Sequence, residues 1–545
     1  MLVILGCRLD SSLLNDGTVL FSRPSGFYDS PFYLEMSCDS GEIRYTLDGS
    51  DPGEDSLLYT APLLIDDASK NENVYSARTD VSLDLNPEVL AAEGLKPLYG
   101  IKVPSQPVDK ATVLRAVCID SFGKRSEVQN AVYFVGFDAK VAYAGINIIT
   151  ITTDPDGLFD YENGIYVLGK RFDEMPRESL DKTTRENYRF WPANYLNRGR
   201  LWEREAHICF FDRDRKLTVE GDFGIRIQGS GGRGLMPKGL NIYAREKYGT
   251  AFVSGEKLFG LSWDLNRLNL NSGNDDMDTL LKDCIVNTLA GEMTFDTRPC
   301  EPYALFLDGE YWGMYWLTPR YKEDYFQGEY GLSGDEMMMV KSNSKEMTAE
   351  IGDSSDARAY QELIDTVAQR DMRDPGEYAW LCRQIDIDSY IDYYAVEMYI
   401  ANTDWPNNNV AAWRTRQAGE GPCADGKWRW LLYDVNMSMD LRHVRTNYIQ
   451  RTAGRDPMFC SLIANGEFLD RVRAKLVELA QDTFHPSKVS AFIKAYEQRM
   501  GKAMEYNFVR FRGGERTLKD FLDDCQSVNA FFEGRHAYIM EAYGE

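Results

Sequence analysis

The spacing of apolar and polar residues changes character twice along the chain. Between about residues 19 and 135, short apolar runs alternate with polar positions and are separated by Gly, Pro and Asp turns. Four such runs are clear: Phe32–Met36, Ile43–Leu47, Val113–Cys118 and Ala131–Val135. Period-two alternation with turn residues between the runs is typical of an antiparallel β-sandwich. We therefore predict an all-β, immunoglobulin-like domain over residues 18–137.

Beyond residue 137, strand and helix patterns are mixed until about residue 445, and from there to the end the pattern is helical. Helical periodicity is clearest in four stretches: Thr279–Ala290, Ile387–Ile400, Phe468–Gln481 and Val489–Tyr506. Amphipathic helices of this kind bury one face against a neighbouring element. We therefore predict an α+β domain over residues 138–445, followed by a helical C-terminal part over residues 446–545 that packs on it.

Two segments fall outside these patterns. Residues 66–110 interrupt the β-sandwich as a polar insertion without clear periodicity. Residues 1–17 are a leader remnant or linker, in which the run from Ile4 to Cys7 is similar to the end of a lipoprotein signal. On that interpretation Cys7 carries a lipid anchor; the alternative is an apolar first strand with a buried cysteine.

Length and charge narrow the classes of function. A chain of 545 residues exceeds what one hydrophobic core usually serves, so several domains are expected. Asp and Glu number 85 against 61 Lys and Arg, which gives a net charge of -24. This excess of carboxylates repels phosphate backbones, so nucleic acid is not an expected partner. No apolar run reaches the length of about 18 residues that indicates a transmembrane helix.

The ten cysteines and four histidines show no metal-ligand spacing. No C-x-x-C pair occurs, and no histidine lies within a few residues of another. Zinc clusters and multi-histidine sites depend on such close spacing, so we predict no structural metal cluster. The cysteines are equally compatible with free thiols and with a few long-range disulfides.

A glycine-rich turn between two strand patterns is the first candidate for chemistry. It extends from Gly224 to Tyr243, and Lys238 enters its second strand. Backbone N–H groups in such a turn approach phosphate oxygens closely, and a lysine nine residues after Gly229 can reach the same phosphates. A simple hairpin without a ligand is the alternative.

Two acidic residues further along complete an ordered set. Asp404 and Asn409 stand five residues apart in the loop after a predicted helix, the separation found in protein-kinase catalytic loops. An apolar strand then ends in Asp434. Phosphoryl transfer needs metal ions on the triphosphate, a cation on the phosphates and a carboxylate that orients the attacking hydroxyl. Single Asp residues are common in turns, but the ordered set favours phosphoryl transfer.

Longer strings resemble two known families. Ile43–Pro52 and Thr112–Ala116 look like parts of a chitobiase C-terminal-type domain. Five other strings resemble the spore-coat kinase family CotH: Leu158–Val167, Gly224–Gly229, Leu307–Tyr315, Asn402–Asn409 and Tyr433–Asp434. The CotH resemblance implies a protein-kinase-like domain that binds ATP and Mg²⁺. It also implies transfer of the γ-phosphoryl group to Ser or Thr of secreted or cell-surface proteins.

The CotH resemblance assigns roles to individual residues. It makes Asp404 the catalytic base, with Asn409 and Asp434 as the metal ligands. Lys238 corresponds to the catalytic lysine that contacts the phosphates. The other expected nucleotide contacts lie in the glycine-rich turn: Arg226, Gly229 and Arg233.

The sequence departs from the family pattern at Gly232, Gly239, Pro319 and Asn436, where the family usually has two hydroxyl and two carboxyl side chains. Because these groups would lie near a nucleotide, a catalytically silent surface scaffold is the alternative to the kinase. A polysaccharide-active enzyme is a third interpretation, drawn from the chitobiase-like domain and the many aromatic residues. The expected location is extracellular or at the cell surface, with polysaccharide or cell-wall association through the β-sandwich as a further interaction.

Overall fold

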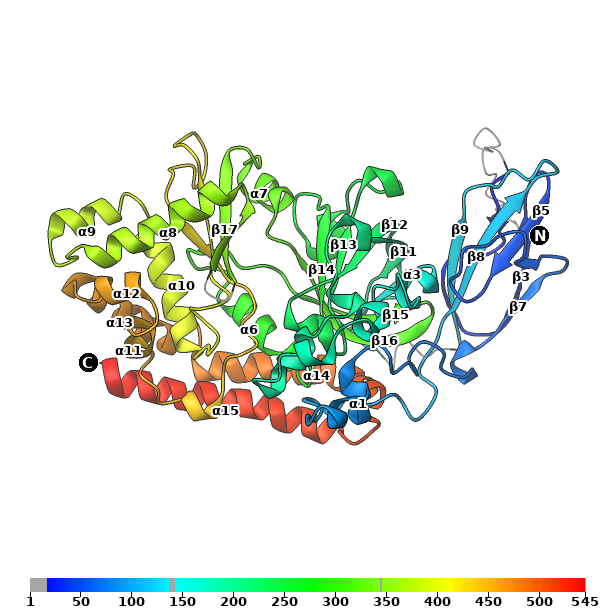
Figure 1. Cartoon of the computed structure of the whole chain (residues 1–545). Helices are drawn as coiled ribbons and strands as arrows, with labels where there is room; N and C mark the ends of the chain where they lie inside the picture. Colours follow the sequence, from blue (N-terminus) through cyan, green and yellow to red (C-terminus); the bar gives the residue numbers. More distant parts are fainter. Residues whose placement is uncertain (1–16, 137–142, 344–345, 545) are drawn as a thin grey trace, which may run out of the picture.

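The computed structural model describes residues 17–136, 143–343 and 346–544. Figure 1 shows a β-rich N-terminal region, a central β-barrel with a second sheet beyond it, and helices along one side. The predicted leader with Cys7 and the predicted boundary at residues 137–138 lie outside the described residues. Among the helices that the structure describes, none has the length and apolar character needed to cross a membrane.

The N-terminal region consists of two layers of strands. Five strands form one sheet in the order β2 (Gly26–Tyr28), β9 (Gln129–Val135), β8 (Thr112–Ile119), β5 (Glu42–Thr46) and β6 (Leu57–Leu58). Two further pairs are β1 (Leu20–Phe21) with β4 (Met36–Ser37) and β3 (Phe32–Leu34) with β7 (Leu63–Ile65). Leu34 packs with Leu114 and Tyr133 in a core shared by the two layers. The predicted strands are confirmed, and a disulfide between Cys38 and Cys118 joins them.

Seven strands close into the central barrel. Their order is β10 (Asn147–Thr152), β11 (Arg204–Phe211), β12 (Leu217–Ile227), β13 (Leu240–Tyr243), β14 (Arg267–Asn271), β16 (Glu310–Pro319) and β15 (Glu301–Leu307). Strands β10 and β15 are parallel and close the barrel, whereas the other neighbours are antiparallel. Ile149, Phe223 and Leu305 belong to one buried core. All ten residues of β16 are buried, because other elements cover its outer face.

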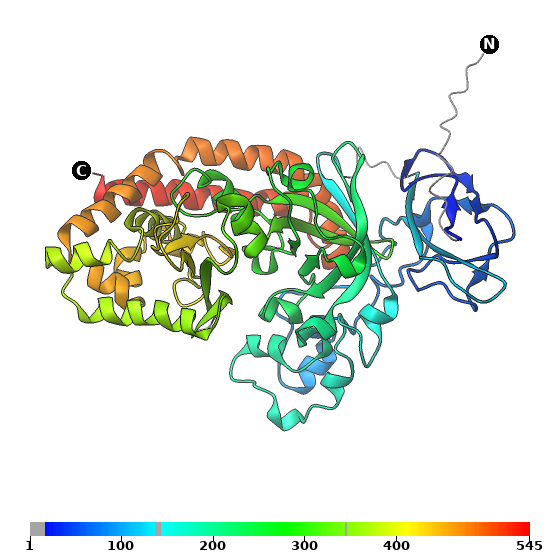
Figure 2. The same cartoon turned by 90° about the horizontal axis from the view of Figure 1, so that it is seen from above.

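The polar insertion at residues 66–110 packs on the barrel. It contains α1 (Pro87–Ala92), and its Leu83 and Leu90 share a buried cluster with Tyr188 and Trp191. In Figure 2 its blue helix lies among the cyan segments that flank the barrel. A few isolated apolar residues therefore fix this segment, which explains why it shows no periodicity.

The N-terminal region and the barrel share an apolar interface. The Phe134 ring lies 4.9 Å from the Phe306 ring of the barrel, edge to face. The Glu310 carboxylate accepts hydrogen bonds from the backbone N–H groups of Val74 (2.6 Å) and Ser76 (2.7 Å). The N-terminal region and the barrel therefore stabilise each other through direct contacts. The domain boundary at residue 137 stays a prediction.

A second, four-stranded sheet lies beyond the barrel. Its order is β18 (Glu346–Ile351), β17 (Met337–Asn343), β19 (Ala411–Thr415) and β20 (Arg429–Leu431). The helices between the strands are α3 (Pro155–Phe159), α4 (Gly169–Asp173), α5 (Gly255–Phe259), α6 (Lys282–Leu289), α7 (Glu323–Tyr330), α8 (Ser354–Gln369), α9 (Pro375–Leu381) and α10 (Ile387–Tyr399).

The helical C-terminal part is confirmed. It comprises α11 (Tyr448–Ala453), α12 (Pro457–Leu462), α13 (Gly466–Gln481), α14 (Pro486–Arg512) and α15 (Leu518–Tyr543). In Figure 2, α14 and α15 run side by side along one flank, from the barrel towards the C-terminus. The buried guanidinium of Arg535 on α15 donates to the carbonyls of Met398 (2.8 Å) and Tyr399 (3.0 Å), so it fastens the end of α10. The C-terminal helices thereby position the loop that follows α10.

Candidate functional site

A buried acidic residue lies in the last turn of α10, just before the loop that follows this helix. Helix α10 is N-capped by Asp386, whose side chain accepts the Ser389 N–H, and Glu397 lies in its last turn. The fully buried Glu397 carboxyl accepts a hydrogen bond of 2.9 Å from Asn402 Nδ2. Burial, together with the nearby carboxylates of Asp283 and Asp434, raises the pKa of Glu397 to about 8. Glu397 therefore keeps its proton at neutral pH.

Asp404 and Asn409 meet in this loop, as their spacing predicts. Asn408 Nδ2 donates to one Asp404 oxygen at 2.7 Å, and Asn409 Nδ2 donates to the other at 3.1 Å. Asn409 has a φ of 61°, a left-handed conformation that Asn tolerates better than most residues. The same Asn409 amide lies 3.3 Å from the backbone oxygen of Asp434. Asp404, Asn409 and Asp434 are thus brought together from two segments.

A third carboxylate joins them from the barrel side. Asp283, in the first turn of α6, accepts the N–H of Val435 at 3.0 Å. Burial raises the pKa of the half-buried Asp434 to about 7, and the nearby Asp283 and Asp404 carboxylates raise it too. The cations Lys341 and Arg298 oppose this rise without cancelling it. We call Asp283, Glu397, Asp404 and Asp434 the acid cluster.

Lys341 on β17 lies close enough to the acid cluster for its charge to lower the pKa of Asp434. Its Nζ lies 3.9 Å from the centre of the Tyr433 ring. Burial lowers the pKa of Lys341 to about 8, whereas the charges of Glu350 and Asp434 act in the opposite direction. Sequence reasoning missed Lys341 and Asp283. Asp283 is a polar position on a predicted helix, which is a weak signal, and Lys341 carries no motif.

Lys238, in contrast, is held within the glycine-rich turn. It is completely buried, and its Nζ donates to the carbonyls of Arg233 (2.5 Å) and Leu235 (3.1 Å). Its Nζ also lies 3.9 Å from the centre of the Tyr195 ring. Burial, together with the charge of Arg233, holds the pKa of Lys238 well below its usual value.

The two arginines of the turn also interact with neighbouring groups, Arg233 with backbone carbonyls and Arg226 with an aromatic ring. Arg233 donates to the carbonyls of Gly229 (2.7 Å), Tyr195 (3.0 Å) and Ile227 (2.5 Å). Arg226 lies on the Tyr243 ring, with 4.2 Å from guanidinium carbon to ring centre. Among the described residues, no hydrogen bond or ion pair joins Arg226, Gly229, Arg233 or Lys238 to the acid cluster. Their roles in nucleotide binding stay predictions.

Packing accounts for two of the four departures from the family pattern. A Cβ atom at Gly232 would lie 2.4 Å from Asn274 Oδ1, and one at Gly239 would lie 2.4 Å from Gln228 Oε1. A side chain at either position would displace the end of the Asn274 or Gln228 side chain, so the present packing favours glycine there. Asn436 donates weakly to the Gly273 carbonyl at 3.5 Å.

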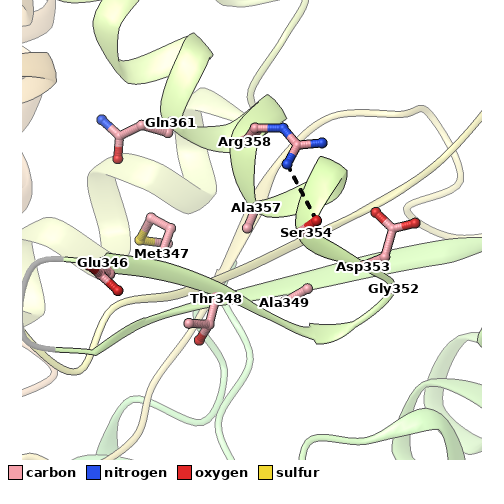
Figure 3. Close-up of a pocket in the computed structure, with 10 residues that line it drawn as sticks. All are labelled: Glu346, Met347, Thr348, Ala349, Gly352, Asp353, Ser354, Ala357, Arg358 and Gln361. Carbon is pink, nitrogen blue, oxygen red and sulfur yellow. Dashed lines mark hydrogen bonds between the residues drawn. The ribbon is translucent and has the colours of Figure 1, made fainter.

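The surface also contains a pocket of about 700 Å³ between β18 and α8. Figure 3 shows its lining, in which Arg358 donates to Ser354 Oγ at 3.3 Å. None of the residues predicted for the site, and no member of the acid cluster, lines this pocket. We therefore place the candidate site at the acid cluster, where the predicted residues Asp404, Asn409 and Asp434 lie together, and not at this pocket.

Comparison with known proteins identifies the family of the chain. No curated protein matches the chain. A family described as Fn3 associated matches residues 33–133, within the N-terminal β region, while the chitobiase-type label stays a prediction. The family described as CotH kinase protein matches residues 225–539, which include the glycine-rich turn, the acid cluster and the C-terminal helices. Since this match covers more than half of the chain, the protein belongs to the CotH kinase protein family.

Proposed function

We propose that this protein is an ATP-dependent kinase that phosphorylates Ser or Thr of secreted or cell-surface proteins. The observation that carries the proposal is the meeting of Asp404, Asn409 and Asp434 in a member of the CotH family. A carboxylate to orient a hydroxyl, and an Asp with an Asn to hold a metal, are the protein groups that phosphoryl transfer requires.

The acid cluster fits Mg²⁺. This ion prefers carboxylate and carbonyl oxygens, and Asp434 with Asn409 provides them, with Asp283 close by. Burial is the main cause of the raised pKa of Asp434, and the charges of Asp283 and Asp404 add to it, so a bound divalent cation would offset both effects. When bound, Mg²⁺ would neutralise the charge of the ATP triphosphate.

The chain's own residues then have distinct tasks. Asp404 orients the acceptor hydroxyl and takes its proton, while Asn408 and Asn409 hold both carboxylate oxygens in place. Lys341 is positioned to supply positive charge beside Asp434. Lys238 would act on the phosphates only if its amine left the Arg233 and Leu235 carbonyls.

The engagement of Lys238 favours a second candidate function. If the lysine never contacts a nucleotide, the protein is a catalytically silent surface scaffold, as the Pro319 and Asn436 departures also allow. A location outside the cytoplasm is part of both proposals. It is supported by the Cys38–Cys118 disulfide, because such bonds persist mainly in oxidising compartments.

Nucleotide binding and transfer separate the two functions. We expect the purified full chain to bind ATP in the presence of Mg²⁺ and to bind it weakly in the presence of a chelator. Labelled γ-phosphate should then appear on Ser or Thr of the chain or of secreted proteins from the same cell. Binding without any transfer would favour the scaffold, and no Mg²⁺-dependent binding at millimolar ATP would contradict both the kinase and the metal site.

A further inference from the structure

A second polar cluster lies on the barrel, outside the segments matched by either family. It consists of two cross-strand pairs on the β11–β12 hairpin, which we call the patch: His207 lies opposite Asp222, and Cys209 lies opposite Glu220. These positions alternate with Ile208 and Phe210, which face the apolar core. The patch therefore lies on one face of the hairpin, opposite that core.

Three of these side chains converge on a single point. Glu220 Oε1 lies 3.3 Å from His207 Nε2 and 3.5 Å from Cys209 Sγ. One donor atom from each of His207, Cys209 and Glu220 lies within 4.8 Å of the other two. From these contacts we propose that His207, Cys209 and Glu220 bind a divalent metal ion of the Zn²⁺ class.

Two of the three donor separations match those of a tetrahedral site, and the third, between His207 and Cys209, is below 4.8 Å. Zn–N and Zn–O bonds of about 2.0–2.1 Å at tetrahedral angles place N and O about 3.3 Å apart, and a Zn–S bond of about 2.3 Å places S and O about 3.5 Å apart. The two observed separations have these lengths. An imidazole, a thiolate and a carboxylate also form a donor set that suits Zn²⁺ and excludes Mg²⁺ or Ca²⁺ as the preferred ion.

The surroundings of His207 are those of a metal ligand. Its Nδ1 lies 2.8 Å from Asp222 Oδ1, so the second ring nitrogen is held by a carboxylate and Nε2 is directed at Glu220. A carboxylate behind a histidine fixes the tautomer and orientation of metal-ligating imidazoles. His207 is only 11% exposed, which limits competition from water.

Buried hydroxyls beside the patch provide an independent observation. Thr150 and Thr152 of β10 lie directly across from Cys209 and His207, and both residues are almost fully buried. The Thr150 hydroxyl interacts with the Cys209 sulfur, whereas the Thr152 hydroxyl oxygen has no hydrogen-bond partner within the described part of the chain. Unsatisfied buried polar atoms are uncommon, and a metal with its fourth, water ligand would give the Thr152 hydroxyl a polar neighbour.

The position of the site indicates a structural role. Ser25 Oγ, from the N-terminal β region, donates to Glu220 Oε1 at 3.3 Å. Phe27, two residues later, lies 5.2 Å from the Phe211 ring of β11. A metal at Glu220 would therefore stiffen the junction between the N-terminal region and the barrel. Binding would release the protons of the Cys209 thiol and the His207 imidazolium to solvent.

Zinc and cobalt titrations test the proposal on the untagged full chain, stripped with a chelator and then assayed with excess Mg²⁺ to occupy the acid cluster. We expect one Zn²⁺ per chain by calorimetry, and a thiolate-to-metal absorption band with Co²⁺. Zn²⁺ should also raise the Tm. No Zn²⁺ binding at micromolar concentration, or binding without the Co²⁺ band, would overturn the site and leave a hydrogen-bonded cluster only.

Matched variants locate the ion. Cys209→Ser should remove the Co²⁺ band and weaken Zn²⁺ binding at least about a hundredfold, and Asp222→Asn should weaken it about tenfold to a hundredfold. Cys460→Ser, at an exposed thiol, should bind as the wild type does. Glu220→Gln serves if Cys209→Ser fails to fold, as judged by circular dichroism in chelator. Wild-type affinity in both ligand variants would contradict the assignment.

Discussion

The two halves of the predicted nucleotide site differ in how their charges are satisfied. In the glycine-rich turn, the cations Lys238 and Arg233 donate to at least five backbone carbonyls and face no carboxylate of the acid cluster. Around Asp434, carboxylates from α6 and from the loop after α10 crowd together, and the nearby cations do not cancel their effect. The cations of the glycine-rich turn are thus satisfied by backbone carbonyls, whereas the carboxylates around Asp434 are not fully balanced by cations.

This difference separates structural from functional polarity. A buried cation whose donors are mostly engaged by backbone carbonyls stabilises the turn that surrounds it and has few donors left for a ligand. Carboxylates held close together cost folding free energy, which a bound cation would recover. From this comparison we expect a ligand to bind at the acid cluster, and the participation of Lys238 is the question that experiments must decide.

The largest expected effect belongs to Asp404→Asn. In the proposed kinase Asp404 acts on the acceptor hydroxyl and not on ATP, so kcat should fall by about two to four orders of magnitude while ATP affinity stays nearly unchanged. Single-turnover transfer assays and a fluorescent-nucleotide titration measure the two quantities. If kcat and affinity both change by less than a factor of about two, Asp404 is only a turn residue.

Asp434→Asn should affect binding first. Loss of this charge should weaken Mg²⁺-dependent ATP binding by at least about tenfold to a hundredfold, the cost of disturbing even an outer metal contact. Without Mg²⁺, the variant should be more stable than the wild type at pH 8, because a crowded charge has been removed. Calorimetry with Mg²⁺ and thermal melts in chelator measure these opposite effects. Unchanged ATP affinity in the variant would remove Asp434 from the metal site.

A pair of lysine variants is designed to break the comparison directly. Lys238→Met leaves two buried carbonyls without a donor, so unfolding free energy should fall by about 1–3 kcal/mol while Mg²⁺-ATP still binds. Lys341→Met should do the reverse, with weaker nucleotide binding and little loss of stability. Denaturant unfolding and nucleotide titration apply to both variants. Loss of ATP binding in a folded Lys238→Met protein would restore the role implied by the CotH resemblance.

The smallest expected effect is on stability against pH. The pKa of Asp434 is about 7 in the folded protein and near 3.8 when exposed, so the folded state binds the extra proton between these values. Stability in chelator should therefore fall as pH rises from 4 to 7, by a few degrees in Tm. Mg²⁺ should reduce this fall, and Asp434→Asn should make it smaller, with the raised pKa of Glu397 accounting for part of the remainder. An identical pH profile in Asp434→Asn would show that another group titrates.

Local patterns in the sequence were enough for the N-terminal strands, for several helices and for part of the site, but not for the barrel or the second sheet. Alternation predicted the N-terminal strands, and helical periodicity predicted α6, α10, α13 and α14, because each of these signals depends on neighbours within a turn or two. The Asp404–Asn409 spacing predicted a shared position because both residues lie in one short loop, where sequence distance limits spatial distance.

The tertiary structure decided everything that depends on distant segments. Asp283 and Lys341 come close to Asp434 only because the fold brings α6 and β17 to the segment that follows β20, and nothing in their local sequence marks that approach. The His207, Cys209 and Glu220 cluster requires the register of the β11–β12 hairpin, which brings side chains thirteen and eleven residues apart into contact. Lys238 follows a glycine-rich turn, as a phosphate-binding lysine would, yet its amine donates to the backbone carbonyls of Arg233 and Leu235. Side-chain direction is set by the competition among all buried polar groups for partners, and that competition exists only in the folded chain.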